Sequence, residues 1–524
     1  GNVLTAVDPL GDTTSFTYDT HGQMETVTSP MGKTVTFDHN AVGDLTDVTD
    51  PKNRTISMTY DADSSDLLSI TSPLGNTVEI EYDARHRPTR IEDSNGNTMM
   101  TASYNDVDQS FVYTDANSKQ TKLDYTPTSG TQTYPTFTRT DAYGEGTAAA
   151  VTEYILSVSK TIDRIDYPDN TYETFVYDEL GRARETTLTD STNSIRTLLR
   201  RDSQGYPRYF ETRYNNSNTK ATTFNYYSDM TLQSIVDENS KTFTYDYDSV
   251  GRIDSITRSS GSNQTTNQTY TYDKADQLTQ TDFGSFAHAR YFYNKDGQTR
   301  LTVRYVTGGS YVLTVYKYDP VDGRLVRIEY KRSTQEPSYN DETDVINYNG
   351  GTLTALTTLQ YAFDPDGRMV SKTRILFDDN GDPLRTHWCN FAYNELGRLI
   401  GESYDLGTAD GQHTRSYEYD PAGNRTVKYE DGVRTDYTYA ALPSQHTNQL
   451  SAESINGGAV TKYLYDAMGN LTAANVDSNG NNQYDTASED GKSFAWNLAG
   501  QLSGVVVWSG GASTDSVQYT YEHN

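Results

Sequence analysis

Side chains that carry oxygen alternate along one short segment near the carboxyl end of the chain. Calcium-binding loops place oxygen ligands at alternate positions, with a glycine at the sixth position and a carboxylate at the twelfth. Gly480 comes two residues early for that pattern, and Glu489 falls one residue late. The spacing predicts a calcium site, and a solvated hairpin loop is the alternative. The five predicted ligands are Asp477, Asn479, Asn481, Gln483 and Asp485.

Residues 378–382 form a weaker calcium candidate, because they combine three Asp residues with an Asn-Gly pair. Asn-Gly is also a common sequence for a tight hairpin turn, which is the alternative here. Both candidates predict that a chelator lowers the melting temperature of the protein and that calcium restores it. We expect no other cofactor.

Catalytic patterns do not stand out among the remaining residues. The eight histidines are scattered and form no His-Glu-x-x-His motif. We find no Gly-x-Ser-x-Gly elbow and no glycine loop that cradles phosphate. The single cysteine, Cys389, excludes a disulfide framework and a cysteine-based metal cluster. We therefore expect a protein that is not an enzyme.

The composition favours strands over both disorder and helices. Leu, Val, Ile and Phe make up less than a fifth of the 524 residues, and the net charge is −29, which together would suggest disorder. However, the chain has 43 Tyr and only 15 Pro, whereas disordered segments are poor in aromatic residues. Tyr and Thr suit a half-buried pleated surface. A Tyr ring can pack while its hydroxyl stays hydrated or hydrogen-bonded.

The acidic charge and the lack of long apolar segments exclude some partners. Phosphate binding needs clusters of Lys and Arg, which this chain lacks, so we expect no nucleic acid partner. No segment approaches 18 consecutive apolar residues, so we expect no membrane span, and no signal peptide is visible. The simplest explanation for the negative charge is the solubility of a large surface.

A repeat of about 21 residues runs through the first hundred positions. A tyrosine or its counterpart occupies positions 18, 39, 60 and 82. A second marker, Pro-x-Gly or its counterpart, begins nine residues earlier each time, at positions 9, 30, 51 and 73. Two markers in constant register indicate a structural repeat, and repeats must be recognised before domains are counted.

Each repeat is predicted to be one β-hairpin. Asp12–Tyr18 alternates Thr with aromatic residues, as strands do. Asp19–Gly22 has turn residues, since Asp bonds back to the backbone and Gly supplies a positive φ. Gln23–Ser29 forms the second strand, and Pro30–Gly32 closes the unit because Pro fixes φ and Gly permits the left-handed conformation.

Copies of the Tyr-Asp-x-x-Gly turn recur to the end of the chain. We predict an all-β fold, a single continuous array of antiparallel hairpins. It is regular over residues 1–105, irregular over about 106–161, repetitive over 162–330, irregular over about 331–359 and repetitive over 360–524. The irregular stretches are loop insertions or diverged repeats, and both chain ends fall inside a unit. The repeat residues include Tyr18, Asp19, Gly22, Tyr60, Asp61, Tyr82, Asp83, Tyr177, Asp178, Gly181, Tyr247, Asp248, Gly251, Tyr419, Asp420, Gly423, Tyr465, Asp466 and Gly469.

The Tyr-Asp-x-x-Gly-Arg/Asn-Leu consensus with its Pro-x-Gly partner resembles the YD-repeat, or rearrangement hotspot (RHS), family over nearly the whole chain. The resemblance implies a long β-sheet strip that spirals into a hollow shell. In bacterial polymorphic toxins and insecticidal toxin complexes such a shell encloses a toxic domain, and in teneurins a similar shell serves adhesion.

One motif tests how far this resemblance extends. Encapsulating members of the family cleave themselves at an Asp-Pro-x-Gly motif that follows the repeats. Asp420-Pro421-Ala422-Gly423 has those letters, but it falls on the repeat spacing. We therefore interpret it as an ordinary repeat turn.

The sequence supports two main hypotheses for function. The first is a secreted, non-catalytic shell that encloses or scaffolds a polypeptide such as a toxin domain lying outside this segment. The second is an extracellular filament, stalk or adhesive cell-surface protein built from the same repeats. The expected partners are an enclosed polypeptide or copies of the chain itself. A surface receptor or a carbohydrate that stacks on Trp508 is a further alternative.

Overall fold

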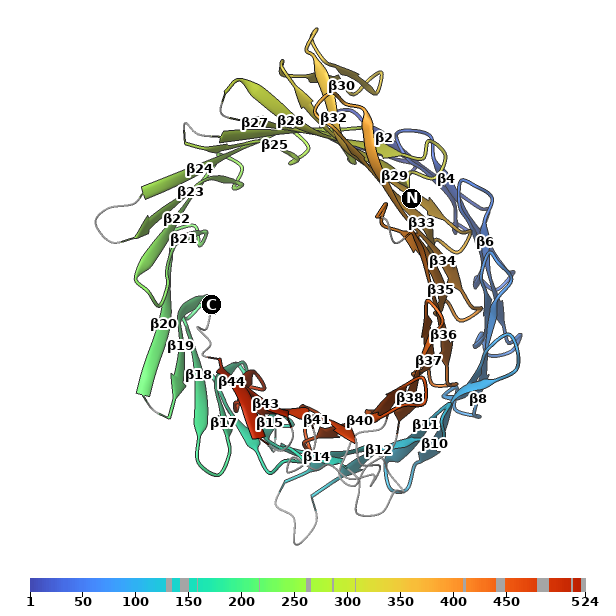
Figure 1. Cartoon of the computed structure of the whole chain (residues 1–524), viewed down its shortest axis with the longest axis vertical. Helices are drawn as coiled ribbons and strands as arrows, with labels where there is room; N and C mark the ends of the chain where they lie inside the picture. The colour runs from blue at the N-terminus through green and yellow to red at the C-terminus, as the bar shows by residue number, and fades with distance from the viewer. Residues whose placement is uncertain are drawn as a thin grey trace.

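The strands of this computed structural model follow one another around a ring (Figure 1). The structure describes residues 1–128, 134–141, 150–157, 159–215, 217–260, 265–284, 287–306, 308–408, 411–439, 448–477, 490–509 and 512–519. Over these residues the regular secondary structure consists of strands alone, so the predicted all-β class is confirmed.

Among the described residues, forty-two strands form one sheet, and a separate sheet has two strands, β30 and β31. Each strand of the large sheet pairs antiparallel with the next along the chain, and β29 pairs with β32. The strands are β1 (Thr5–Val7), β2 (Thr13–Tyr18), β3 (Met24–Thr28), β4 (Thr34–His39), β5 (Leu45–Thr49), β6 (Thr55–Tyr60), β7 (Leu67–Thr71), β8 (Thr77–Tyr82), β9 (Pro88–Glu92), β10 (Thr98–Asn105), β11 (Ser110–Asp115), β12 (Gln120–Thr126), β13 (Thr136–Asp141), β14 (Ala150–Leu156), β15 (Ile162–Asp166), β16 (Tyr172–Tyr177), β17 (Ala183–Thr189), β18 (Ser194–Arg201), β19 (Pro207–Tyr214), β20 (Ser217–Tyr226), β21 (Leu232–Val236), β22 (Lys241–Tyr247), β23 (Ile253–Ser260), β24 (Thr265–Tyr272), β25 (Leu278–Phe283), β26 (Ala287–Tyr293), β27 (Thr299–Val306), β28 (Ser310–Tyr318), β29 (Leu325–Ser333), β30 (Ser338–Asn340), β31 (Val345–Asn347), β32 (Leu353–Phe363), β33 (Met369–Phe377), β34 (Pro383–Tyr393), β35 (Leu399–Asp405), β36 (Gln412–Tyr419), β37 (Arg425–Glu430), β38 (Val433–Tyr439), β39 (Leu450–Ile455), β40 (Val460–Tyr465), β41 (Leu471–Asp477), β42 (Gly491–Trp496), β43 (Leu502–Ser509) and β44 (Ala512–Gln518).

The first repeat shows how the sequence produces a hairpin. β2 and β3 lie within the two strands predicted for this unit. In the turn between them, the Asp19 amide donates to the Gln23 carbonyl at 2.9 Å and the Gly22 amide donates to the Asp19 carbonyl at 3.1 Å. Gly22 has φ of 85°, a left-handed conformation that glycine adopts without steric cost.

The consensus tyrosine also marks a regular break in strand pairing. Thr17 pairs with Thr26, but Tyr18 pairs with Met24, so Glu25 is left over as a bulge. The same shift occurs before Tyr82 and before Tyr177. A bulge bends its strand and increases the local twist of the sheet. Because it recurs in many of the hairpins, it favours the curvature of the strip.

The strip forms more than one turn of a spiral. We call the row of turns that follow the consensus tyrosines the Tyr–Asp edge (for example 19–23) and the opposite row the Pro–Gly edge (for example 29–33). The Pro–Gly edge of the first turn, up to β12, meets the Tyr–Asp edge of the second turn, which begins at β27. In Figure 1 these two runs of strands lie along the same arc of the ring.

In the part of the chain that the structure describes, the fully buried Leu and Val side chains form one cluster. Leu301, Val303, Leu313 and Val315 on β27 and β28 are at most 1% exposed. The hairpin of β30 and β31 covers them with Tyr339, Ile346 and Tyr348, and Figure 1 shows this hairpin outside the ring. It occupies the predicted irregular stretch 331–359, whereas β11–β14 continue the sheet through the other irregular stretch.

Candidate functional site: the seam between successive turns

The consensus aspartate organises each Tyr–Asp turn. Asp178 Oδ1 accepts hydrogen bonds from the amides of Leu180 and Arg182, both at 3.0 Å. Its Oδ2 accepts from Arg182 Nε at 2.7 Å. The backbone hydrogen bond from Arg182 is the largest factor that lowers the pKa of the Asp178 carboxyl. A charged aspartate is therefore built into the turn. Turns at Asp19, Asp61, Asp83, Asp248, Asp420 and Asp466 accept amide hydrogen bonds in the same way.

The consensus tyrosine connects one repeat to the one before it. Tyr177 Oη donates to the Ile162 carbonyl at 2.6 Å, 15 residues earlier. That carbonyl belongs to β15, the second strand of the preceding hairpin, where the consensus has Leu. Burial raises the pKa of Tyr177, which keeps the hydroxyl protonated as a donor. The same hydrogen bond recurs in four other repeats. It runs from Tyr18 to the Val3 carbonyl, from Tyr82 to that of Leu67, from Tyr247 to that of Leu232 and from Tyr419 to that of Leu399.

The predicted repeat tyrosines also include Tyr60 and Tyr465. Tyr60 Oη lies 3.8 Å from Met58 Sδ. Tyr465 ends β40, and burial raises its pKa. Each of these tyrosines is the last residue of its strand, β6 or β40, and the sequence alone did not reveal the carbonyl acceptors. The available signal was the Leu of the consensus, which recurs 15 residues before several of the tyrosines.

The consensus arginine joins neighbouring Tyr–Asp turns. Arg252 Nε donates to Asp248 Oδ2 at 2.7 Å, and its Nη1 donates to the Asp273 carbonyl of the next turn at 2.8 Å. Its guanidinium lies 4.8 Å from the centroid of the Tyr272 ring. A cation over an aromatic face is attracted by the ring quadrupole. Each such arginine thus fixes the spacing between two hairpins.

Ion pairs join the two turns of the spiral. Lys33 forms an ion pair with Asp296, whose Oδ1 also accepts from the Met31 amide at 3.0 Å. Lys52 Nζ lies 2.6 Å from Asp319 Oδ2 and 3.2 Å from Asp322 Oδ2.

The side chain of Asp322 is 3% exposed and also accepts from Arg54 Nη2 at 2.7 Å. The hydrogen bond to Asp319 is the largest factor that raises the pKa of Lys52. The hydrogen bond from Lys52 is likewise the largest factor that lowers the pKa of Asp319. Both groups are therefore held in their charged forms at neutral pH.

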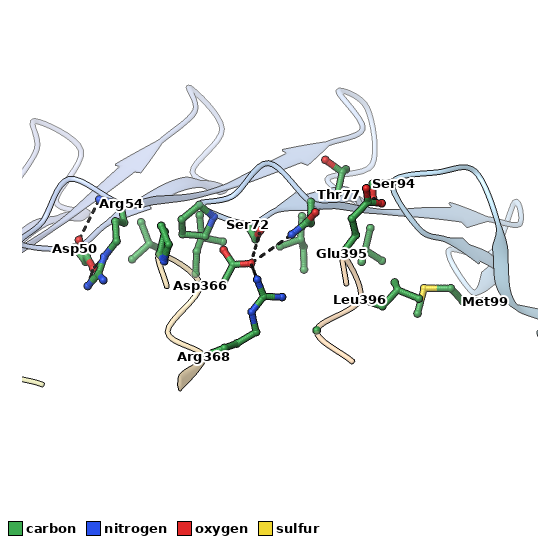
Figure 2. A pocket seen from close by; sticks show the side chains of 18 of the residues that line it. Asp50, Arg54, Ser72, Thr77, Ser94, Met99, Asp366, Arg368, Glu395 and Leu396 are labelled. Atoms are coloured by element: carbon green, nitrogen blue, oxygen red, sulfur yellow. Dashed lines mark hydrogen bonds and ion pairs between the residues drawn. The ribbon is translucent and has the colours of Figure 1, made fainter. Parts of the chain in front are cut away.

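Further along, Asp366 takes the central place in the seam (Figure 2). Its carboxylate accepts from the Leu74 amide at 3.0 Å and from Ser72 Oγ at 3.2 Å. Arg368 lies 3.4 Å from the same carboxylate and supplies its counter-charge. In the next repeat Glu395 accepts from Ser94 Oγ at 3.1 Å. These contacts bring together residues about 300 positions apart in the sequence.

A cavity of about 550 Å³ lies between the turns at this point. The first turn lines it with Ile56, Ile70 and Val78, and the second turn lines it with Pro365 and Leu396. Figure 2 shows Leu396 pointing towards Met99 across the seam. The seam therefore combines charged contacts at the turn tips with apolar contacts beside them.

The predicted calcium loop lies mostly outside the described residues. Asp477 ends β41 at 7% exposure, and its carboxylate lies 3.3 Å from Lys462 Nζ. Asn479, Asn481, Gln483 and Asp485 fall in residues 478–489, which the structure does not describe. Among the residues that it describes, no group of three or more His, Cys, Asp or Glu side chains is arranged to hold a metal. Calcium binding at this loop stays a prediction.

The second calcium candidate forms a repeat turn. Asp378 Oδ1 accepts from the amides of Asn380 and Asp382, both at 2.9 Å, and Gly381 has φ of 86°. This is the hydrogen-bonding pattern of the other turns.

The Asp-Pro-x-Gly segment is also a repeat turn. Asp420 Oδ1 accepts from the Asn424 amide at 2.8 Å, and Gly423 has φ of 92°. Asp420 Oδ2 accepts from Asn117 Nδ2 at 2.8 Å, which places this turn in the seam. Over the described residues, no helix is long and apolar enough to cross a membrane.

A continuous hairpin strip whose turns are joined edge to edge defines a repeat-shell protein. A family model described as Teneurin YD-shell matches residues 2–495. The chain belongs to this family, and the resemblance to YD-repeat proteins is confirmed. Its role is accordingly that of a structural shell.

Named relatives match over short stretches. A segment of 245 residues is 27% identical to Teneurin-4 of Mus musculus and covers 45% of this chain and 8% of that protein. A segment of 106 residues is 26% identical to double-stranded DNA deaminase toxin A of Burkholderia cenocepacia (strain H111), covering 20% of this chain and 7% of that protein. The chain therefore spans less than a tenth of these relatives. Among solved structures, the Tc holotoxin pore of Photorhabdus luminescens is similar with 13% identity and a TM-score of 0.39, over 97% of this chain and 39% of that chain.

Proposed function

We propose that this chain is a wall segment of a secreted, non-catalytic shell that encloses a polypeptide. The observation that carries the proposal is the seam. A strip without seam contacts would leave gaps between its turns, whereas the contacts of Asp296, Asp322, Asp366 and Glu395 hold the turns side by side. Membership of the YD-shell family supports the same function.

The position of the last strands agrees with an enclosed cargo. In Figure 1, β43 and β44 lie within the outline of the ring, while the hairpin of β30 and β31 lies outside it. A segment joined after β44 would start on the inner side of the wall. A cargo held there would be shielded from proteases.

A protease-protection experiment tests this function. An unstructured reporter peptide is added after residue 524, and a matched variant carries it between Asp341 and Glu342 in the β30–β31 turn. We expect the first reporter to be cleaved much more slowly than the second. Asp322→Asn should weaken the seam and speed cleavage of the protected reporter. Equal cleavage at both positions would contradict enclosure.

The filament, stalk or adhesive function is the second proposal, and electron microscopy of the purified chain separates it from the first. Separate closed particles support enclosure, and long open tubes support the structural role. A carbohydrate partner gains little support from Trp508, because its indole is half-buried and donates to Ser493 Oγ at 3.3 Å. A surface receptor stays a prediction.

A further inference from the structure

One consensus arginine in the seam has different contacts from the others. Arg252 and Arg368 each lie four residues after the turn aspartate, and each donates through Nε to its Oδ2 at 2.7 Å. Both also donate to a backbone carbonyl of the next Tyr–Asp turn. Arg324 follows Asp319 by five residues, because its turn contains one additional residue. Lys52 of the first spiral turn takes Asp319 Oδ2 at 2.6 Å, so the usual ion pair of this arginine is replaced by a seam contact.

The guanidinium of Arg324 is left with weak contacts. Its Nε lies 3.6 Å from Asp322 Oδ2, which is too far for a good hydrogen bond, and the same oxygen accepts from Arg54 at 2.7 Å. Nη1 is buried and has no hydrogen-bond partner among the described residues. Buried donors are normally paired, and an unpaired one is costly. A carboxylate matches the fork of a guanidinium and would supply the missing acceptor.

Arg324 also lines the seam cavity of about 550 Å³ (Figure 2). On the first spiral turn the cavity wall consists of two cross-strand pairs, Val48 with Ile56 and Ile70 with Val78. Ile56 and Ile70 are still 41% and 38% exposed, so this apolar surface is open to a ligand. Cavities of about 300–1,000 Å³ with apolar walls and a few polar groups are typical sites for small molecules.

The other charged groups of the cavity already have partners. Three carboxylates and two further arginines line it, and each forms a hydrogen bond or an ion pair across the seam or within its own turn. They are Asp50, Asp366, Glu395, Arg54 and Arg368. Arg324 is therefore the lining cation whose donors are least used, and its charge complements an anion.

We propose that the seam cavity binds a small amphipathic carboxylate. The carboxylate pairs with Arg324, whose side chain is 32% exposed, and a small rotation of the guanidinium brings Nη1 to the second oxygen. The apolar chain of the ligand lies over Ile56 and Ile70. Because such a ligand contacts both spiral turns, it stabilises the seam when it binds. The inference concerns the wall itself and does not depend on the enclosure of a cargo.

Isothermal titration calorimetry of the purified chain with decanoate tests the proposal. Decanol carries the same alkyl chain without the charge, and acetate carries the charge without the chain. The titrations are run below the micelle concentration and at physiological ionic strength, where screening limits repulsion by the net charge of −29. We expect saturable binding of decanoate, at least about tenfold weaker binding of decanol, and no saturable binding of acetate.

Three variants assign the site. Arg324→Gln should weaken decanoate binding by about tenfold or more and leave decanol binding unchanged, because only the carboxylate contact is lost. Ile70→Asn makes the apolar wall polar and should weaken the binding of both probes. Arg184→Gln removes an exposed arginine outside the cavity and should bind both probes like the original chain. Circular dichroism checks that each variant keeps its strands.

Three results would each overturn the assignment of a carboxylate site at Arg324. The first is no saturable binding of decanoate to the original chain. The second is equal affinity for decanoate and decanol, which would mean that the charge of the ligand is not recognised. The third is unchanged decanoate binding by the folded Arg324→Gln variant, which would place the ligand elsewhere on the chain.

Discussion

Two hairpins of the same repeat family are stabilised in different ways. In β6 and β7, Ile56 and Ile70 are 41% and 38% exposed, and the sheet is a single layer. In β27 and β28, Leu301 and Leu313 are fully buried because a second layer, β30 and β31, covers them. A sheet buries an apolar face only against another layer. The regular wall must therefore obtain much of its stability from its hydrogen-bonded turns and tyrosines.

A substitution in the covered region of β27 and β28 should have the largest effect on stability. Leu313→Ala should lower the local free energy of unfolding by about 2–5 kcal/mol, the cost of a cavity in a closed core. The matched change Ile70→Ala in the single-layer wall should cost less than about 1 kcal/mol, since its side chain stays partly in water. Hydrogen exchange of the amides in β28 and β7 measures both losses, because repeat arrays open locally. Equal losses of stability in the two variants would show that the β30–β31 layer does not stabilise β27 and β28.

Sequence patterns predicted the hairpin well because its determinants are local. The turn at Asp19–Gly22 and the strands on either side depend on neighbouring residues, and so do the turns at Asp248 and Asp466. The seam could not be predicted. It joins residues 263 to 333 positions apart, such as Lys33 with Asp296 and Asp115 with Asn448. The residues that meet there depend on the accumulated curvature of all the strands between them.

The covering layer was also missed. Residues 331–359 interrupt the repeat, and a loop insertion and a diverged repeat fitted the sequence equally well. Tyr339 lies in a different strand from Ile346, seven residues earlier, so the common face of Tyr339, Ile346 and Tyr348 against β27 and β28 is apparent only in the structure.

Removing the hydroxyl of a tyrosine that links two repeats should have the next largest effect on stability. Tyr177→Phe removes the hydroxyl that bonds the Ile162 carbonyl, and it should destabilise β15 and β16 by about 1 kcal/mol. Tyr113→Phe in β11 is the control, because that side chain is 37% exposed. Hydrogen exchange should detect the first change alone. If both variants behave like the original chain, packing of the rings and not the hydroxyl stabilises the wall.

Backbone strain at one turn gives a smaller effect of opposite sign. Met230 occupies the turn position that glycine takes elsewhere, with φ of 71°. A side chain costs about 1–2 kcal/mol in this left-handed conformation, and the greater freedom of glycine in the unfolded chain offsets part of the gain. Met230→Gly should therefore stabilise β20 and β21 by up to about 1 kcal/mol. Gly251→Met at the equivalent position, φ 90°, should destabilise its hairpin. Chemical denaturation, monitored by hydrogen exchange, compares the stability of the two variants. If Met230→Gly destabilises its hairpin, Met230 is not strained in the original chain.

Acid should have the smallest effect, because the carboxylates of the Tyr–Asp turns are in contact with water. Hydrogen bonds from Arg87 are the largest cause that lowers the pKa of Asp83 from 3.8 to about 2. Since the folded pKa lies below the unfolded value, this carboxylate contributes its full stability above pH 3.8. The contribution decreases as pH falls from 3.8 to about 2 and is absent below. The turn at Asn497, which bonds the Gln501 amide at 2.9 Å through an uncharged side chain, is the natural control. Amide exchange at Arg87 should accelerate over this pH window, relative to the intrinsic rate, more than exchange at Gln501. If the two amides show the same change in exchange rate with pH, the negative charge of Asp83 does not stabilise the turn.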